Sequence, residues 1–331
     1  MSRNATNQLL QKAKKSKSDE FYTQFCDISS ELQHYKEHFK GKTVYCNCDD
    51  PRTSNFFRYF ALNFHSLGLK KLIAACYSDS ELDLFQTEEI EKGFFYEYSG
   101  TEEEKNSLES PNIIHFKGNG DFRSTESIEL LKQSDIVVTN PPFSLFREYV
   151  AQLMKYEKKF LIIGNINAIT YKEIFELIQK GKVWLGVNLG RGISGFIVPN
   201  HYSLYGTETK TDEDGNNIVA TNNCLWLTNL ELAKRHENIE LTKEYYGNES
   251  KYPKYDNCEG INVSKTQDIP YDYFGLMGVP ITFLHKFNPD QFEIVRFRKG
   301  DDGKDLSVGG KCPYFRILIR NKRIAEKQAV S

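Results

Sequence analysis

One stretch of the chain combines an amide side chain, two prolines and an aromatic ring in an order that can do chemistry. It reads Asp135-Ile-Val-Val-Thr-Asn-Pro-Pro-Phe143, in which a short apolar strand runs directly into the polar and cyclic residues. Pro141 and Pro142 fix φ at successive positions and remove two N–H donors, so the loop can neither pair as a strand nor wind as a helix. It therefore holds Asn140 and Phe143 in place at the end of the strand.

These residue types suit methyl transfer to an exocyclic amine such as the amino group of adenine. That nitrogen is a poor nucleophile because its lone pair is delocalised into the ring. The side-chain oxygen of Asn140 and the backbone carbonyl of Pro141 can each accept one of its N–H groups, which favours a tetrahedral nitrogen aimed at a sulfonium methyl. Phe143 would stack on a base pulled out of the helix. The alternative is an ordinary Pro-rich turn, but the preceding strand and the helix expected over 145–155 favour the chemical interpretation.

Thr139-Asn-Pro-Pro-Phe143 resembles the catalytic motif of the amino-methyltransferases that use S-adenosyl-L-methionine. The similarity extends to Lys14-Lys-Ser-Lys-Ser-Asp-Glu-Phe-Tyr-Thr23, Tyr45-Cys-Asn-Cys-Asp-Asp-Pro51 and Phe315-Arg-Ile-Leu-Ile319. Over essentially its whole length the chain resembles the EcoRI-type adenine-specific DNA methyltransferases. The resemblance implies N6-adenine methylation of double-stranded DNA within GAATTC by a monomeric, cytoplasmic enzyme. The cognate restriction endonuclease would act on the same site without forming a complex with it.

Alternating apolar and amphipathic segments predict an α/β fold with a doubly wound, mostly parallel sheet. Strands are expected at 43–48, 71–77, 113–116, 135–138, 160–164, 183–187 and 224–230, and helices at 28–39, 52–67, 145–155 and 171–179. Residues 80–110 look like an acidic, irregular insert. We expect a basic flexible arm over 1–17, a catalytic domain over 18–230 and a smaller target-recognition region over 231–331. This order is the gamma arrangement of amino-methyltransferases, and ligands of such sheets bind at the carboxyl ends of the strands.

The resemblance also places the contacts to the cofactor. The cofactor-binding candidates are Phe21, Tyr22, Thr23, Asp49, Asp50, Asp79, Asp121 and Phe122. The first three lie where the family lines the methionine end of the cofactor. Asp49 or Asp50 could accept from its ammonium group, and Asp79 follows the second strand, where the ribose-binding acid usually lies. Asp121 would read the N6 amine of the cofactor's adenine, with Phe122 against the ring; an Asn-Gly turn is the alternative there.

The turn after the first strand lacks the glycine-rich sequence of common dinucleotide sites, and the EcoRI-type proteins share this departure. A metal site is an alternative for this region, because His34 and His38 are four residues apart and Cys46 and Cys48 follow. A Cys-x-Cys pair on a strand, however, points both thiols to one face at a spacing that chelates poorly. We therefore expect buried thiols and no metal.

Candidate contacts to the substrate lie in loops and at the chain ends. Gly190-Arg-Gly-Ile-Ser-Gly-Phe196 resembles the loop that packs against the flipped base, so Phe196 is a candidate wall of that pocket, although a core Phe in a β-hairpin is nearly as good an interpretation. Tyr245-Tyr-Gly-Asn-Glu-Ser-Lys-Tyr-Pro-Lys-Tyr255 interleaves aromatics with lysines, which suits nucleic-acid contact and also occurs in surface loops. The DNA-binding candidates are Lys12, Lys14, Lys15, Lys17, Arg191, Lys251 and Lys254.

The net charge of −2 is compatible with DNA binding because the charges are segregated. Residues 1–17 carry five Lys or Arg and no acid, and residues 296–331 carry ten against four acids. Residues 79–109 carry eleven acids and two lysines. The basic ends could form one face, although a solvated tail at each end explains the same pattern.

The remaining composition narrows the class of protein. A chain of 331 residues with 39% apolar residues can bury a sizeable core, and no stretch is long and apolar enough to cross a membrane. Seven cysteines without a repeating framework suggest a reducing compartment. None of the ten prolines precedes a cysteine, which argues against cytosine C5 methylation. The alternatives left open are N4-cytosine methylation, methylation of RNA or of a protein glutamine, and a non-catalytic DNA-binding protein on the same fold.

Overall fold

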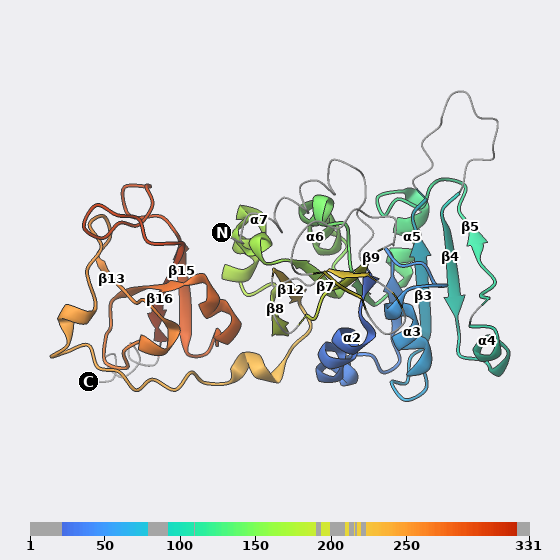
Figure 1. Cartoon of the computed structure of the whole chain (residues 1–331), viewed down its shortest axis with the longest axis horizontal. Helices are drawn as coiled ribbons and strands as arrows, with labels where there is room; N and C mark the ends of the chain where they lie inside the picture. Colours follow the sequence, from blue (N-terminus) through green and yellow to red (C-terminus); the bar gives the residue numbers. More distant parts are fainter. Residues whose placement is uncertain are drawn as a thin grey trace, which may run out of the picture. The chain divides into compact units, whose positions relative to one another are not determined.

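The computed structural model describes residues 22–78, 92–108, 110–189, 193–198, 209–211, 215, 217–219 and 223–322. The site candidates Phe21, Asp79 and Arg191, and the lysines of the N-terminal arm, lie outside these residues. The chain divides into two compact units, shown in Figure 1. The first comprises Met1–Tyr171 and Gly186–Leu230, and the second comprises Lys172–Leu185 and Glu231–Ser331.

The first unit is built on an eight-stranded sheet in the order β5-β4-β3-β2-β6-β7-β12-β8. Its central strands are parallel neighbours: β3 (Lys71–Cys76), β2 (Thr43–Cys46), β6 (Ile136–Thr139) and β7 (Lys159–Asn165). The flanking strands β4 (Phe94–Tyr98), β5 (Ile114–His115) and β12 (Cys224–Thr228) join antiparallel, and β8 (Trp184–Leu189) lies at the edge. The expectation of a mostly parallel sheet is therefore corrected to a mixed one with a parallel centre.

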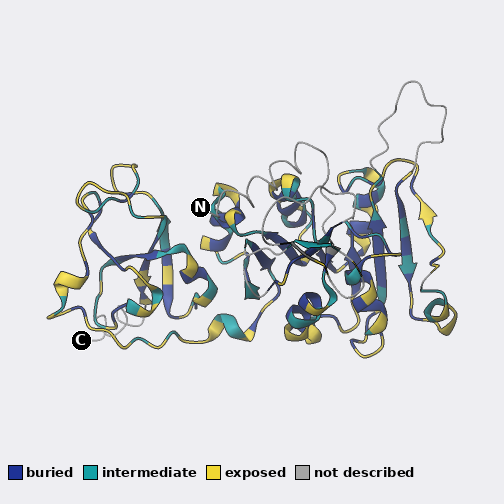
Figure 2. Cartoon of the chain, viewed as in Figure 1, coloured by how far each residue is buried: buried dark blue, intermediate teal, exposed yellow. Residues whose placement is uncertain are grey.

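Helices cover both faces of this sheet, as a doubly wound α/β fold requires. Figure 1 shows α2 (Phe25–Leu32) and α3 (Asn55–Leu62) on one side, and α5 (Thr125–Gln133) and α6 (Phe146–Lys155) on the other. Because both faces are covered, every residue of β2 and of β6 is buried, and these strands read as continuous apolar runs. Figure 2 shows the buried centre of the sheet and the exposed outer faces of the helices.

The segment expected to be an irregular acidic insert is partly regular. Strand β4 lies within this segment. Its residues alternate between buried and half-buried, and the buried ones are Phe94, Tyr96 and Tyr98. The short helix α4 (Glu102–Asn106) follows. Its three glutamates lie in the first turn, where their negative charge stabilises the positive end of the helix dipole. The strand expected at 113–116 is reduced to β5, a two-residue edge strand on which Ile114 is 48% exposed. The many acids of this segment indicated an irregular loop, but every second residue of 94–98 is a buried aromatic, which is the pattern of a strand.

A second, smaller sheet of the first unit links the start of the chain to its middle. Its order is β1-β9-β11-β10, with β1 at Tyr22–Thr23, β9 at Phe196–Val198, β11 at Asn217–Val219 and β10 at Thr209–Thr211. The neighbouring strands are antiparallel throughout. Strand β1 therefore pairs with a segment more than 170 residues away in sequence, through Thr23 and Phe196.

The second unit has its own sheet, in the order β13-β14-β16-β15. These strands run over Gly260–Asn262, Leu276–Pro280, Arg316–Asn321 and Phe292–Phe297. Helix α7 (Lys172–Gln179) belongs to this unit and packs on β15, where the rings of Phe175 and Phe297 stack with centroids 4.6 Å apart. In the described part of the chain, we find no helix with the length and apolarity that a membrane crossing requires.

Candidate active site

The candidate catalytic loop, Asn140-Pro-Pro-Phe143, is held by the strand before it and the helix after it. Thr139, the last residue of β6, is fully buried, and Pro141 is buried next to a half-buried Asn140. A 3-10 turn over Phe143–Leu145 follows and leads into α6. Phe146, the first residue of α6, packs on Gly164 of β7, where a Cβ atom would lie 2.6 Å from its ring. Only glycine at this position lets the helix approach the sheet closely enough to keep the loop at the strand end.

Asp49 ties the turn after β2 to the base of this loop. One carboxylate oxygen accepts from the hydroxyl of Ser54 at 2.7 Å, and the other accepts from the hydroxyl of Thr139. Ser54 also caps α3, because its oxygen accepts from two backbone N–H groups of the first turn, at 3.1 and 3.3 Å. Burial raises the pKa of Asp49 to about 6, while the two hydroxyl donors oppose that shift. The carboxylate thus connects α3, β2 and β6 at one point.

Two other candidate carboxylates share one local arrangement. Asp50 accepts from Nε and Nη2 of Arg52 at distances of 2.7–3.2 Å, and Asp121 accepts from Nε and Nη2 of Arg123 at 2.9 and 2.7 Å. Both are Asp-x-Arg segments in turns of the sheet, and each aspartate also accepts from the backbone N–H of its arginine at 2.8 Å. The hydrogen bonds from Arg123 lower the pKa of Asp121. Asp121 therefore stays ionised, and each of the two carboxylates keeps acceptor positions for a ligand.

Phe122 lies against α6. Its ring centroid is 5.1 Å from that of Tyr149, and its backbone carbonyl accepts from the side chain of Gln152 at 2.9 Å. Only 6% of Phe122 is exposed. The hydroxyl of Tyr149 in turn donates to the side-chain oxygen of Asn47, in the turn after β2. Helix α6 therefore connects the expected adenine-binding segment to the strand that precedes Asp49.

The structure brings three sequence-predicted segments together around the catalytic loop. Thr23 pairs with Phe196 across β1 and β9, and the ring of Phe196 lies 6.1 Å, centroid to centroid, from that of Phe143 at an angle of 63°. Asn55 of α3 donates to the carbonyl of Thr23 at 2.9 Å. The segment expected at the cofactor, Phe196 and the candidate catalytic loop are thus linked by direct contacts, and Phe196 itself is only 3% exposed. Tyr22 contributes its backbone to β1.

Helix α2 holds the loops beside this site, a role that sequence analysis missed. Asp27 accepts from the backbone N–H and the hydroxyl of Ser194 at 2.9 and 2.8 Å, just before β9. Glu31, with no exposed surface, accepts from the backbone N–H groups of Val187 and Asn188, both at 2.8 Å. Burial raises the pKa of both acids. Their spacing of four residues, on the same helix face as buried Ile28, was the available signal.

Two further candidate residues belong to the second unit. Lys251 and Lys254 are exposed on the second unit, and Lys251 donates to the side-chain oxygen of Asn248 at 2.8 Å. In the same segment Tyr245, Tyr252 and Tyr255 are buried in the core of that unit. These three rings therefore cannot serve as a stacking surface, which corrects that part of the nucleic-acid interpretation.

Cys46, the last residue of β2, is a buried thiol as expected, whereas Cys48 lies in the turn after the strand and is half-buried. Burial raises the pKa of both Cys46 and Cys48 well above the ordinary value, so neither is poised as a thiolate. Across the residues that the structure describes, no group of three or more His, Cys, Asp or Glu side chains could hold a metal ion.

Comparison with known proteins is consistent with this geometry. Residues 9–322 match the family model described as adenine-specific methyltransferase EcoRI. The chain is 66% identical over 324 residues to Type II methyltransferase M.EcoRI of Escherichia coli, covering 98% of this chain and 99% of the relative. It is 37% identical over 330 residues to Type II methyltransferase M.MpnI of Mycoplasma pneumoniae, covering 94% and 98%, and 38% identical over 334 residues to M.MgeORF184P of Mycoplasma genitalium, covering 95% and 98%. No solved structure matches. The chain therefore belongs to the EcoRI family of adenine-specific methyltransferases.

Proposed function

We propose that this methyltransferase transfers a methyl group from S-adenosyl-L-methionine to the N6 amine of an adenine flipped out of double-stranded DNA, within GAATTC. The observation that carries the proposal is the contact between Phe143 of the Asn140-Pro-Pro-Phe143 loop and Phe196. Phe196 in turn pairs with Thr23 across two neighbouring strands. The GAATTC site is supported by 66% identity, over nearly the whole of both chains, to a relative named M.EcoRI. The enzyme would protect host DNA from a restriction endonuclease that reads the same site independently.

The loop residues act by placement. The side-chain oxygen of Asn140 and the carbonyl of Pro141 accept the two N–H groups of the target amine, which orients its lone pair and stabilises the developing positive charge. The half-buried ring of Phe143 provides apolar surface for a flipped base, and Phe196, which is only 3% exposed, supports that ring from behind at an angle of 63°. No base needs to remove a proton before the attack, because the neutral amine is the nucleophile.

The carboxylates beside the loop suit the cofactor. When bound, S-adenosyl-L-methionine supplies an electrophilic methyl group on a sulfonium. We assign its ammonium to Asp50, because the neighbouring Asp49 is buried beneath Ser54 and Thr139, whereas the side chain of Asp50 keeps some exposed surface. Asp121, ionised beside Arg123, would read the adenine amine. Phe21, Tyr22 and Thr23 would line the methionine end, Phe122 the adenine ring and Asp79 the ribose, as the family resemblance implies.

We assign target recognition to the second unit and expect a monomer in the cytoplasm. A monomer suits an enzyme that must methylate hemimethylated sites one strand at a time. The lysines of the N-terminal arm would contact phosphates, and so would Arg191, Lys251 and Lys254. Contacts of charged side chains with phosphates position the DNA and carry no sequence information.

Restriction protection tests the proposal directly. A plasmid with GAATTC sites is incubated with the enzyme and S-adenosyl-L-methionine and then challenged with an endonuclease that cuts GAATTC. Protection is expected only when the cofactor is present, while sites of an unrelated endonuclease on the same plasmid stay sensitive. Nucleoside analysis of the digested plasmid should show N6-methyladenine. N4-methylcytosine would identify the other amino-methylation, and absence of cofactor binding would indicate a non-catalytic protein.

A further inference from the structure

A row of aromatic rings in the second unit ends at the protein surface. Phe175 stacks on Phe297 at 4.6 Å, and Phe297 meets Phe315 edge-on at 5.9 Å. Phe315 then stacks on Tyr314, with centroids 5.0 Å apart and an interplanar angle of 27°. The first rings anchor the row on α7 and β15, whereas Tyr314 is 69% exposed. A lone exposed tyrosine needs no explanation, but one stacked at the end of an anchored row is held in a fixed orientation.

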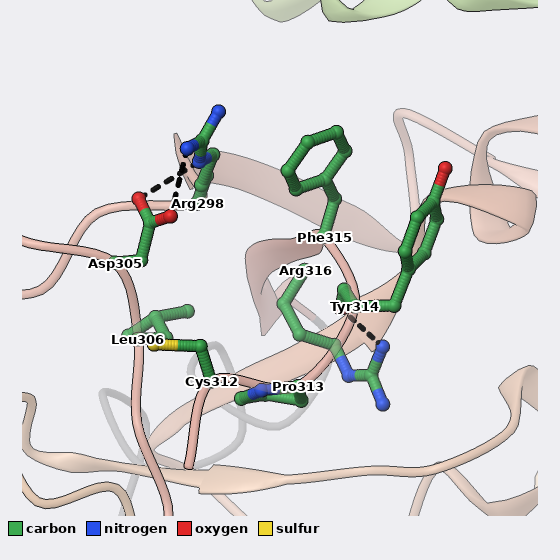
Figure 3. Close-up of a pocket in the computed structure, with 8 residues that line it drawn as sticks. All are labelled: Arg298, Asp305, Leu306, Cys312, Pro313, Tyr314, Phe315 and Arg316. Carbon is green, nitrogen blue, oxygen red and sulfur yellow. Dashed lines mark hydrogen bonds and ion pairs between the residues drawn. The ribbon is translucent and has the colours of Figure 1, made fainter. Parts of the chain in front are cut away.

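Polar contacts hold the same rings from the other side. The guanidinium of Arg298 lies over the Phe315 ring, 4.6 Å from its centroid, and is fixed by Asp305 through hydrogen bonds of 2.8 and 2.7 Å. Figure 3 shows Phe315 between Arg298 and Tyr314 at the wall of a small cavity. Arg316 donates to the backbone carbonyl of Tyr314 at 2.6 Å. The exposed ring is therefore preorganised, and a partner that stacks on it need not first order it.

The charges of the segment that contains Tyr314 indicate what kind of partner fits, and two of its basic residues, Arg298 and Arg316, line the same small cavity as Tyr314. Residues 296–322 carry eight Lys or Arg and three Asp, a net charge of +5. The basic residues are Arg296, Arg298, Lys299, Lys304, Lys311, Arg316, Arg320 and Lys322. Hydrogen bonds from Arg298 and Lys299 lower the pKa of Asp305 to about 2, so this acid stays ionised. Its negative charge is paired with these two cations. An exposed ring in a segment of net positive charge suits contact with the flat face of a base beside phosphates.

We propose that Tyr314 stacks on a nucleobase of the bound DNA, as a contact separate from the pocket that receives the target adenine. This inference rests on the proposed function, because it requires a DNA substrate. Lysines and arginines around the ring would pair with phosphates, and the ring would cover the face of a base. Pulling the target out of the helix leaves neighbouring base faces uncovered, and a fixed aromatic ring can replace part of the missing stacking.

Substitution of the exposed ring tests the proposal with a matched control. Tyr314→Ala should weaken binding to a GAATTC duplex by about 5- to 150-fold, the range of one base–aromatic stack. The salt dependence of binding should keep its slope, because no charge is removed. Tyr314→Phe keeps the ring and should bind like the wild type. The control is Tyr271→Ala, which removes a tyrosine of the same unit that is 45% exposed and lies outside 245–255, and it should leave affinity unchanged.

Two further measurements separate this inference from its alternatives. Tyr314→Trp should show a change of tryptophan fluorescence on DNA binding, above that of the wild type with its two native tryptophans. Binding of S-adenosyl-L-methionine, which the first unit would provide, should be the same in all variants. Wild-type DNA affinity in Tyr314→Ala, or an equal reduction in Tyr271→Ala, would overturn the stacking role. If the wild type itself fails to methylate DNA, the proposed function fails instead.

Discussion

The carboxylate of Asp49 accepts a hydrogen bond from the hydroxyl of Thr139, ninety residues further along the chain. Thr139 is the residue immediately before Asn140, so the contact fixes the point at which the catalytic loop leaves β6. The other oxygen of Asp49 accepts from Ser54, which caps α3. Asp49 therefore links the start of α3 to the end of β6, and we expect it to act on the candidate catalytic loop as a positioning residue.

Replacing Thr139 with Val should lower kcat more than it changes cofactor affinity. The variant keeps the shape of the side chain but removes the donor to a buried carboxylate, which should cost about 1–3 kcal/mol of stability. A small displacement of Asn140 should lower kcat by roughly 10- to 100-fold. Single-turnover methylation at saturating cofactor measures this decrease.

The matched control for that experiment is Thr228→Val. Thr228 is equally buried in the same sheet, on β12, and its hydroxyl donates to the carbonyl of Phe160 at 2.6 Å. This variant should be less stable while its kcat stays close to that of the wild type. Equal decreases of kcat in both variants would assign the effect of Thr139 to general destabilisation of the sheet.

The raised pKa of Asp49 predicts a pH dependence of stability. In the folded protein this pKa lies near 6, above the ordinary value of 3.8. Between these values the folded protein binds a proton that the unfolded protein releases, so the contribution of Asp49 is greatest at the acidic end and falls as pH rises to about 6. The free energy of unfolding of Asp49→Asn should therefore decline less steeply across this window.

Urea unfolding of the two proteins at a series of pH values measures the difference. Asp27 and Glu31, whose pKa values burial also raises, are present in both proteins and cancel in the comparison. Parallel curves would mean that Asp49 titrates in the folded protein as it does in the unfolded chain.

The parts of the site that local sequence determines could be predicted. The apolar run ending at Thr139, the prolines that follow and the helix behind them are all encoded within about twenty residues, and the structure has them at 136–155. The central strands β2, β3 and β7 were recognisable because both of their faces are buried, which makes them continuously apolar.

The relations between distant segments could not be predicted. Nothing near Phe196 indicates that it pairs with Thr23, and nothing near Asp49 indicates that its partner is Thr139. Strand β4 was hidden in an acidic stretch, since charge dominates the composition while burial follows the alternate residues. Tyr245, Tyr252 and Tyr255 looked like surface residues because the core that buries them is assembled from other segments.

We predict that Asn140→Ala abolishes methyl transfer while cofactor affinity stays nearly unchanged. Asn140 serves the target amine, and removing one such positioned group typically costs ~10²–10³ in rate. Single-turnover rates and calorimetric binding of S-adenosyl-L-methionine check the two halves of the prediction. The control is Asn229→Ala. The side-chain oxygen of Asn229 accepts from the backbone N–H of Phe160 at 2.8 Å, so its removal should lower the stability of the protein and leave the rate unchanged. A near-normal rate in Asn140→Ala would refute the catalytic assignment.

Removing the Asp121 carboxylate should weaken S-adenosyl-L-methionine binding by roughly 1–3 kcal/mol, the cost of deleting a hydrogen bond to a charged group. Asp121→Ala also releases Arg123, so a control must separate the two effects. Glu148→Ala removes the other carboxylate on Arg123, at 3.0 Å, and leaves Asp121 in place. Calorimetry should show weaker binding for Asp121→Ala and unchanged binding for Glu148→Ala. Unchanged affinity in both would move the adenine contact to another residue.

The last prediction concerns the basic N-terminal arm. Deleting residues 2–17 should weaken binding to GAATTC and to scrambled duplexes alike, because Arg3, Lys12, Lys14, Lys15 and Lys17 carry charge that suits phosphates. Each lysine–phosphate ion pair that the deletion removes should reduce the slope of log affinity against log salt by about 0.9, so an arm that forms two or three of them should flatten it by roughly two to three.

Titrations of full-length and truncated protein with both duplexes, at several salt concentrations, distinguish three roles for the arm. An arm that clamps the DNA backbone predicts a flatter slope and equally weaker binding to the two duplexes. A solvated tail predicts the same affinity and slope with and without the arm. Weaker binding confined to the GAATTC duplex would instead make the arm a reader of bases, because ion pairs with phosphates cannot distinguish sequences. Cofactor affinity without DNA should stay constant, since the truncation ends before Phe21 and Tyr22.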